Sequence, residues 1–336
     1  MDKITIGKRK VGEGEPCFII AEAGSNHDGR LAQAKRLIDI AAGAGADAVK
    51  FQSFRAEKLF NEVSHKGVVD MLTAMEVQES WHGELRDYAK GKDIVFLSSA
   101  FDEKTADMLD RLGIPAHKIA SYEMTHAPLL EHVARQGKPI ILSTGMATEK
   151  EIGESLKAIE ATGNRQVALL HCVSQYPATP ENVNLRSMVS LKKFGKPVGF
   201  SDHTLNIYAP VAAVALGACI IEKHFTISRL IPGPDHPYAL EPDALKAMVS
   251  GIREVELELG SGEIGPAACE KGERLYRRAV FASQDIPAGT VITKDMTMIV
   301  RPAPEGSLTP GQLKDIVGKK LKTGLKKGDH FTPGMV

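Results

Sequence analysis

Two histidines occupy corresponding places in the 336-residue sequence, each at the end of an apolar run. His203 ends the run in PVGFSDHT (197–204), and His224 ends the run in CIIEKHFT (219–226). Two neutral imidazoles with oxygen donors nearby suit a borderline divalent ion such as Mn²⁺, Co²⁺, Fe²⁺ or Zn²⁺. Without a clear third protein ligand, several coordination positions would stay open to water or substrate, which is typical of a catalytic metal site. The alternative is two core histidines satisfied by hydrogen bonds.

A second set of residues at the ends of apolar runs could bind an anion. It consists of two lysines and four serines: Lys50, Lys118, Ser99, Ser121, Ser143 and Ser201. Ammonium groups together with several hydroxyls match the terminal oxygens of a phosphate. Each lysine could instead be an ion-pair partner of Glu22 or Glu123, and each serine a helix cap. A Schiff-base lysine is a further alternative, but the two histidines argue against it, since a metal would polarise a carbonyl in its place.

Three carboxylates could take part in the chemistry. Glu22 and Glu123 end two more apolar runs, where either could act as a general acid/base or form a structural salt bridge. Asp235 lies in the Pro/Gly-rich segment IPGPDHPYALEP, a loop that either turns the chain or holds substrate. We expect its neighbour His236 to be exposed rather than ligating.

These side chains can meet only if the fold brings the ends of the runs together. Eight apolar runs alternate with helical stretches, at 17–24, 48–54, 95–101, 117–123, 139–145, 167–175, 197–204 and 219–226. The alternation implies parallel pairing, and nearly continuous apolar runs are typical of strands buried on both faces. Eight such units predict an α/β fold, a (β/α)8 TIM barrel, whose active site lies at the carboxyl ends of its strands. An open doubly wound sheet is the rival, but no GxGxxG follows the first run.

Composition excludes several other functions. Lys+Arg and Asp+Glu balance at 42 each, so no net charge favours nucleic acid or an anionic membrane. The four cysteines match no CxxC spacing, and the amino-terminal segment lacks the apolar core of a signal peptide. We therefore expect a reduced, cytoplasmic protein. We predict a barrel domain over 1–260, a linker over 261–278 and a small, mostly β domain over 279–336 that has little core of its own and docks on a larger surface.

With these residues in place, the sequence resembles the sialic acid synthase family over nearly its whole length. The motifs IIAEAGSNHDG, ADAVKFQ, KIASYE, STGM, HCVSQYP, SDHT, EKHFT and GPDH occur in the family's order. The tail, from RRAVFASQDIPAGTVIT to LKKGDHFT, is similar to the family's SAF (antifreeze-like) domain. The sequence departs from the family pattern at Ser99, where threonine is common, at Asn206, and in RPAPEG after Val300.

The resemblance implies a role for each matching residue. His203 and His224 fall on the metal ligands, and Glu22 on the acid/base. The two lysines and four serines above fall where the family holds phosphoenolpyruvate. Four residues fall where the sugar is held: Gln52, Glu123, Tyr176 and Asp235. Arg301 falls on the tail arginine that reaches the sugar's N-acetyl group in the barrel of the other subunit, which implies a domain-swapped homodimer.

The implied activity is condensation of phosphoenolpyruvate with an N-acetylmannosamine-type sugar aldehyde to give a nonulosonic (sialic) acid and phosphate, with Mn²⁺ as metal and Mg²⁺ or Co²⁺ as alternatives. Legionaminic or pseudaminic acid synthesis from a diacetamido-trideoxyhexose is the closest alternative. A metal-dependent pyruvate aldolase or lyase would release no phosphate. A carbohydrate-binding protein without turnover would leave both strand-end histidines unexplained.

Overall fold

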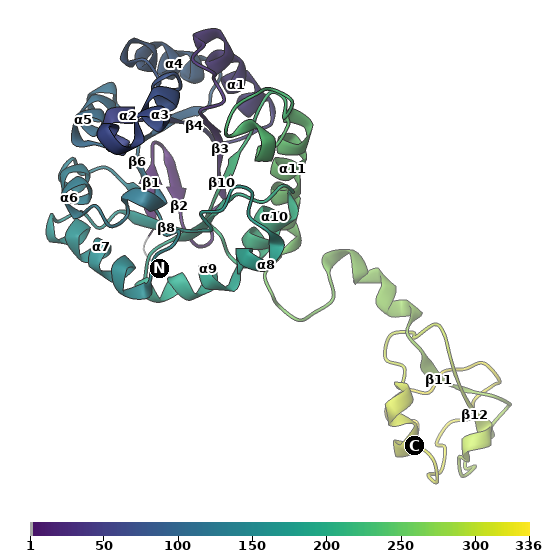
Figure 1. The fold of residues 1–336 in the computed structure, drawn as a ribbon. Helices are drawn as coiled ribbons and strands as arrows, with labels where there is room; N and C mark the ends of the chain where they lie inside the picture. The colour runs from purple at the N-terminus through teal and green to yellow at the C-terminus, as the bar shows by residue number, and fades with distance from the viewer. Residues whose placement is uncertain (1–2) are drawn as a thin grey trace. The chain divides into compact units, whose positions relative to one another are not determined.

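The computed structural model describes residues 3–336, which divide into two compact units with the boundary after Gly260. The first unit is a closed barrel of eight parallel strands, in the order β10-β3-β4-β5-β6-β7-β8-β9 (Figure 1). The strands are β3 (Phe18–Gly24), β4 (Ala48–Ser53), β5 (Val95–Ala100), β6 (His117–Ile119), β7 (Ile140–Ser143), β8 (Val167–Cys172), β9 (Val198–Asp202) and β10 (Ile220–His224). The predicted TIM barrel is confirmed, with one strand in each predicted run.

Helices surround the barrel, as the alternation of runs predicts. They are α1 (Leu31–Gly43), α2 (Ala56–Leu59), α3 (Glu62–Thr73), α4 (Glu79–Gly91), α5 (Glu103–Leu112), α6 (Ala127–Arg135), α7 (Glu149–Ala161), α8 (Pro180–Val183), α9 (Arg186–Leu191), α10 (Tyr208–Ala215) and α11 (Pro242–Glu258). The main core lies between the strands and these helices, where outward strand residues such as Ile19, Val49 and Phe200 are fully or almost fully buried.

A short antiparallel hairpin closes the amino-terminal end of the barrel. It consists of β1 (Ile4–Ile6) and β2 (Arg9–Val11). Ile4, Ile6 and Val11 share a buried cluster with inward residues of the barrel strands, including Phe18 and Ile220. The sequence reading did not predict this hairpin. Its apolar face leaves the opposite end, where the carboxyl ends of the strands lie, as the end that carries polar side chains.

The second unit, Ser261–Val336, contains β11 (Ala279–Ala282) paired antiparallel with β12 (Thr297–Val300). The segments 285–293 and 324–332 pair through reciprocal backbone hydrogen bonds between Ile286 and Leu325. Contrary to expectation, this unit has a small core of its own, with nine buried side chains: Val280, Ala282, Ile286, Ile292, Leu308, Ile316, Leu321, Leu325 and Phe331. Residues 261–278, at the start of this unit, are exposed.

Candidate active site

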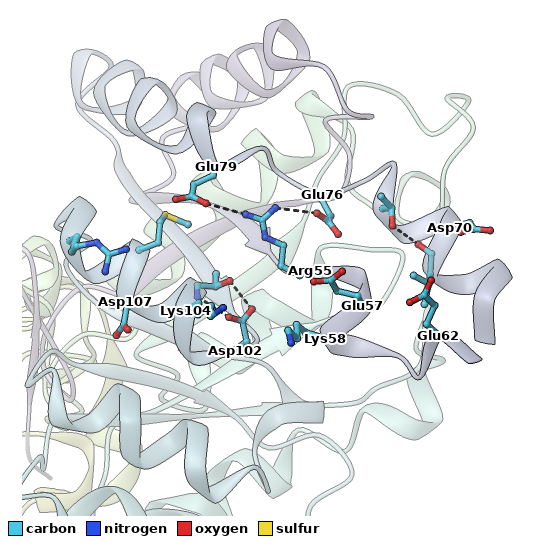
Figure 2. A pocket seen from close by; sticks show the side chains of 15 residues that line it. Arg55, Glu57, Lys58, Glu62, Asp70, Glu76, Glu79, Asp102, Lys104 and Asp107 are labelled. Carbon is cyan, nitrogen blue, oxygen red and sulfur yellow. Dashed lines mark hydrogen bonds and ion pairs between the residues drawn. The ribbon is translucent and has the colours of Figure 1, made fainter. Parts of the chain in front are cut away.

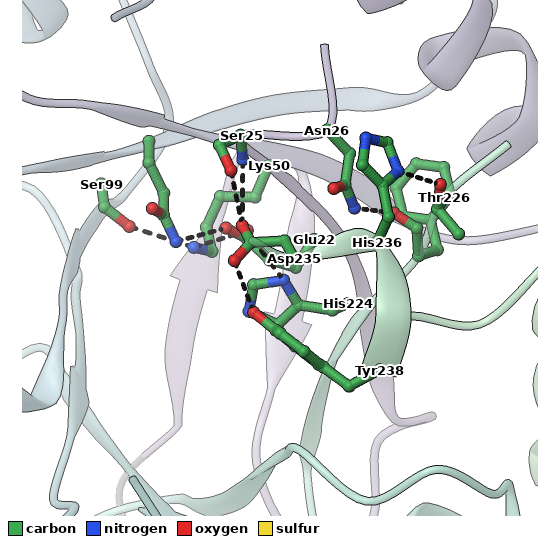
Figure 3. Close-up of polar contacts among 12 residues, drawn as sticks. Glu22, Ser25, Asn26, Lys50, Ser99, His224, Thr226, Asp235, His236 and Tyr238 are labelled. Atoms are coloured by element: carbon green, nitrogen blue, oxygen red, sulfur yellow. Dashed lines mark hydrogen bonds and ion pairs between the residues drawn. The ribbon is translucent and has the colours of Figure 1, made fainter. Parts of the chain in front are cut away.

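Lys50 lies at the centre of the polar groups inside the barrel. Its Nζ is 2.6 Å from Glu22 Oε2 on β3 and donates a hydrogen bond to Ser99 Oγ on β5 at 3.0 Å (Figure 3). Gln52, two residues further along β4, donates to the other Glu22 oxygen at 3.1 Å. Lys50, Glu22 and Ser99 are each no more than 2% exposed. Three adjacent strands therefore bring together groups that are 28 to 77 residues apart in sequence.

Glu222 on β10 is a site residue that our sequence-based assignment missed. Its Oε1 accepts a hydrogen bond from Ser201 Oγ at 3.1 Å and lies 3.5 Å from Lys118 Nζ, while its Oε2 lies 3.7 Å from Lys50 Nζ. Glu222 thus connects the two predicted lysines. A usable signal was present, because Glu222 precedes His224 by two residues and so shares its strand face.

The two buried carboxylates have opposite pKa shifts. Burial raises the pKa of Glu22 above its ordinary value, although Lys50 opposes the shift. Burial also acts on Glu222, but Lys118 and Lys50 outweigh it and lower the pKa of that carboxyl. Glu22 is therefore the carboxylate better suited to exchange a proton near neutral pH.

Hydroxyl groups from three strand ends surround the backbone of Gly145. Ser121 Oγ accepts a hydrogen bond from Gly145 N at 3.0 Å. The hydroxyls of Ser143 and Ser174 are buried and have no hydrogen-bond partner. A methyl group on Gly145 would lie 2.5 Å from Ser174 Oγ and 2.7 Å from Ser121 Oγ, so glycine leaves space there. Buried hydroxyls without partners are uncommon, and a bound anion would satisfy them.

The histidines at the ends of β9 and β10 lie side by side inside the barrel. The ring centroids of His203 and His224 are 5.5 Å apart. His203 Nδ1 donates to the Val173 carbonyl at 2.8 Å, and because a carbonyl can only accept, the neutral ring keeps its lone pair on Nε2. Burial lowers the pKa of His224, which keeps its ring neutral, and its Nδ1 has no hydrogen-bond partner.

This arrangement fits a metal with only two imidazole ligands from the protein. Among residues 3–336, no group of three or more His, Cys, Asp or Glu side chains is placed to hold a metal ion. A metal held by these two imidazoles alone would keep most of its coordination positions open, as in a catalytic site and not a closed structural one.

Of the predicted sugar-facing residues of the barrel, Tyr176 and Asp235 lie beside the histidines. The Tyr176 ring centroid is 4.2 Å from that of His203. Glu123 lies in a 3-10 turn after β6, and its buried Oε2 has no hydrogen-bond partner. Burial raises the pKa of Glu123 to about 7.

Asp235 is held by the protein as well as facing the site. Its carboxylate accepts hydrogen bonds from Ser25 Oγ at 2.9 Å and from Tyr238 OH at 2.7 Å, and Oδ2 lies 3.9 Å from His224 Nδ1 (Figure 3). The expectation that His236 is exposed was wrong. His236 is fully buried, because Thr226 and Asp28 bind its two ring nitrogens at 2.6 and 2.9 Å.

Arg301 lies in the second unit, directly after β12, and is exposed. It is the one predicted site residue outside the barrel. Its place relative to the other thirteen follows from the resemblance alone.

A second polar cavity lies beside the loops that follow β4 and β5 and has a volume of about 710 Å³ (Figure 2). None of the predicted site residues lines it. We therefore assign the chemistry to the barrel interior.

Comparisons with known proteins show which family this chain resembles. A family model described as the NeuB family matches residues 37–264, and one described as the SAF domain matches residues 277–336. The chain is 44% identical to an uncharacterised protein of Methanocaldococcus jannaschii, over 98% of this chain and 97% of the relative. It is 40% identical to the N,N'-diacetyllegionaminic acid synthase of Legionella pneumophila, over 96% of this chain and 95% of the relative.

The crystal structure of N-acetylneuraminic acid synthetase from Leptospira borgpetersenii, in complex with citrate, superposes with a TM-score of 0.77 at 38% identity. The match covers 81% of this chain and 95% of that one. Two further relatives, both 36% identical, have other named products. They are the pseudaminic acid synthase of Campylobacter jejuni, over 94% of this chain and 96% of the relative, and the human N-acetylneuraminate-9-phosphate synthase, over 98% and 95%.

Proposed function

The chain belongs to the NeuB family of sialic, legionaminic and pseudaminic acid synthases, and we propose that it condenses phosphoenolpyruvate with the open-chain aldehyde of an N-acetylmannosamine-type sugar. One observation carries the proposal. A pocket of two lysines and several hydroxyls lies inside the same barrel as two neighbouring imidazoles. The first group suits an enol phosphate, and the second suits a divalent metal beside an aldehyde.

The lysines and hydroxyls would hold the phosphate and so place C3 of phosphoenolpyruvate against the aldehyde carbon. Attack by C3 forms the new carbon–carbon bond, and the aldehyde oxygen takes up a proton. Water then adds to C2, and the C2–O bond breaks to release phosphate and leave a keto group. Positioning of this kind can lower a barrier by roughly 7–11 kcal/mol.

Glu22 would accept the proton from the attacking water, because its raised pKa lets it exchange a proton near neutral pH. His203 and His224 would hold the metal, Mn²⁺ in the proposal, which supplies Lewis-acid polarisation of the aldehyde when bound. Gln52, Glu123, Tyr176 and Asp235 would orient the sugar hydroxyls.

The test is to incubate the full-length protein with phosphoenolpyruvate, Mn²⁺ and a panel of sugars, and to measure phosphate release and product mass. The panel contains N-acetylmannosamine, its 6-phosphate and the diacetamido-trideoxyhexoses, since the named relatives make different products. We expect phosphate and a nine-carbon acid in equal amounts. Turnover of pyruvate without phosphate release would indicate an aldolase, and sugar binding without turnover a carbohydrate-binding protein.

The metal role has its own test. His203→Ala should abolish turnover and weaken Mn²⁺ binding, because one of two imidazole ligands is lost. Wild-type activity that survives thorough chelation would contradict the role.

We also propose that the SAF domain of a second copy covers the barrel and brings Arg301 to the sugar. Large apolar side chains in the segments that follow β6, β7, β9 and β10 are exposed, namely Tyr122, Met146, Tyr208 and Leu230. Apolar groups gathered at one end of a barrel are typical of a surface that is covered in the working assembly. The dimer would be cytoplasmic, in keeping with its four free cysteines. Among residues 3–336, no helix is long and apolar enough to span a membrane.

Subunit mixing tests the exchange. His203→Ala inactivates a barrel and Arg301→Ala inactivates a tail, so in an exchanged heterodimer one of the two sites is intact. Equal mixing of the two inactive proteins should therefore restore up to about a quarter of wild-type activity. No recovery, with heterodimers demonstrated by differential tagging, would contradict the exchange.

A further inference from the structure

A fully buried ion pair joins β9 and β10 one residue before each histidine. Asp202 and Lys223 face each other in register, and Lys223 Nζ lies 2.5 Å from Asp202 Oδ2. Each residue is 1% exposed. Neither residue is among the predicted site residues, and the proposed function assigns no role to either.

Thr204, directly after His203, is bound by both members of the pair. Asp202 accepts hydrogen bonds from the Thr204 amide at 2.9 Å and from its hydroxyl at 3.0 Å. Lys223 Nζ donates to the Thr204 carbonyl and contacts its hydroxyl at 3.3 Å. Lys223, which precedes His224, is therefore bound to both neighbours of His203, namely Asp202 and Thr204.

The alternation of the strands places the pair behind the histidines. Phe200 and Ile221 belong to the core outside the barrel, and residues two further along, Asp202 and Lys223, share that outer side. The intervening positions turn inward, as the bond between Ser201 and Glu222 inside the barrel shows. His203 and His224 continue this inner side.

Stability alone is a poor explanation for the pair. Removing two charges from water is costly, and replacing a buried ion pair by apolar residues of similar size is often neutral or stabilising. A charged pair with four further contacts to one residue has a geometric effect that an apolar pair lacks, since it fixes both the strand register and the turn after His203.

We propose that Asp202, Lys223 and Thr204 form a positioning clamp that sets the separation and orientation of the two imidazoles for a divalent metal. The inference rests on the proposed function, because it assigns the metal to His203 and His224. None of the three residues touches the metal or the substrate. The clamp acts through the backbone on either side of His203 and before His224.

The experiment is a calorimetric titration of Mn²⁺ into metal-free, full-length protein. The double variant Asp202→Leu/Lys223→Met removes the charges and keeps apolar volume. Its matched control is Glu160→Leu/Lys196→Met, which removes an ion pair of 2.6 Å whose lysine is 5% exposed and which lies away from the histidines. Groups that orient metal ligands typically contribute 10–100-fold in affinity, so we expect the Mn²⁺ Kd to rise by about that factor in the first variant only.

Three single variants keep the test decisive if the double variant does not fold. Thr204→Val removes the hydroxyl that both Asp202 and Lys223 contact and should weaken Mn²⁺ binding several-fold. Lys223→Arg keeps a charged donor for Asp202 and should retain more affinity than Lys223→Met. Unfolding midpoints measured without metal separate this effect from a loss of stability.

The outcomes separate the clamp from the proposed function. Wild-type affinity in folded clamp variants, while His203→Ala loses binding, would overturn the clamp alone. A wild-type protein that binds Mn²⁺ no better than His203→Ala would overturn the proposed metal site and the clamp with it.

Discussion

At the scale of single residues, the lack of a side chain on Gly145 leaves space beside the hydroxyls of Ser121 and Ser174. Gly145→Ala would push a methyl group to within 2.7 Å of both oxygens, into the volume assigned to the phosphate. We expect the KM for phosphoenolpyruvate to rise at least about tenfold, with a smaller change in kcat, because the lost interaction is mainly one of binding. Steady-state kinetics measure both constants.

Gly153→Ala is the control. Gly153 lies in the middle of α7, and a methyl group there would have one neighbour outside its own helix, at 3.9 Å. Alanine in a helix should leave the KM unchanged and stabilise the protein slightly. An unchanged KM in Gly145→Ala as well would argue against a phosphate at this place.

Glu123 predicts a pH dependence of stability. Burial raises its pKa from the ordinary 4.5 to about 7, so the folded protein keeps this proton at pH values where the unfolded chain releases it. The loss of folding stability caused by Glu123 begins as pH rises above 4.5 and reaches its full size above about 7. Glu123→Gln should therefore increase the free energy of unfolding by about 1–3 kcal/mol at pH 8 and by little at pH 4.5.

Urea unfolding at the two pH values measures this difference. The same variant should turn over the sugar more slowly if Glu123 orients it, so a gain in stability would accompany a loss of activity. An equal gain at both pH values would contradict the titration of Glu123.

At the scale of elements, the periodicity of the sequence was sufficient to locate all eight strands, because each is an almost continuous apolar run. The predicted strand 117–123 illustrates the limit. The structure ends β6 at Ile119 and forms a 3-10 turn at 121–123, where Ser121 binds the backbone of Gly145 from the next loop. A contact of that kind depends on the closed barrel and leaves no mark on the local pattern.

The hairpin β1–β2 was missed for a related reason. Each of its strands has three residues, too few for alternation to be distinguished from chance. Ile6→Ala removes a fully buried side chain that packs on the barrel interior, and should lower the free energy of unfolding by about 2–5 kcal/mol. The exposed neighbour Thr5 is the control, and Thr5→Ala should change it by less than about 0.5 kcal/mol. Denaturant titration compares the two.

At the scale of the whole molecule, residues 261–278, which begin the second unit, are all exposed. This segment contains Lys271, Arg274, Arg277 and Arg278, so brief trypsin treatment of the full chain should cut there first. Mass spectrometry should then show a barrel fragment and a SAF fragment that both persist. Early cleavage within 279–336 would contradict the independent core of that unit.

How much of the site could be predicted differs between the two units. The residues of the barrel mouth follow from the carboxyl ends of parallel strands, which meet at one end of any such barrel. Ser25 and Tyr238, which are 210 and 3 residues from Asp235 in sequence, were missed because they lie outside the strands, where no strand rule applies. Arg301 is connected to the site by resemblance, since no periodicity relates the tail to the barrel.

The hairpin at the amino-terminal end also has a kinetic consequence. Because the hairpin closes that end, both reactants must enter the barrel from the opposite end. The enol phosphate, which is assigned to the lysines, has the deeper binding site, since Ser99 there is 1% exposed whereas Tyr176 in the sugar site is 44% exposed. A molecule bound at the outer, sugar site blocks access to the inner site. In the proposed reaction the enol phosphate would therefore bind first, and excess sugar should slow turnover by forming a dead-end complex with the empty enzyme.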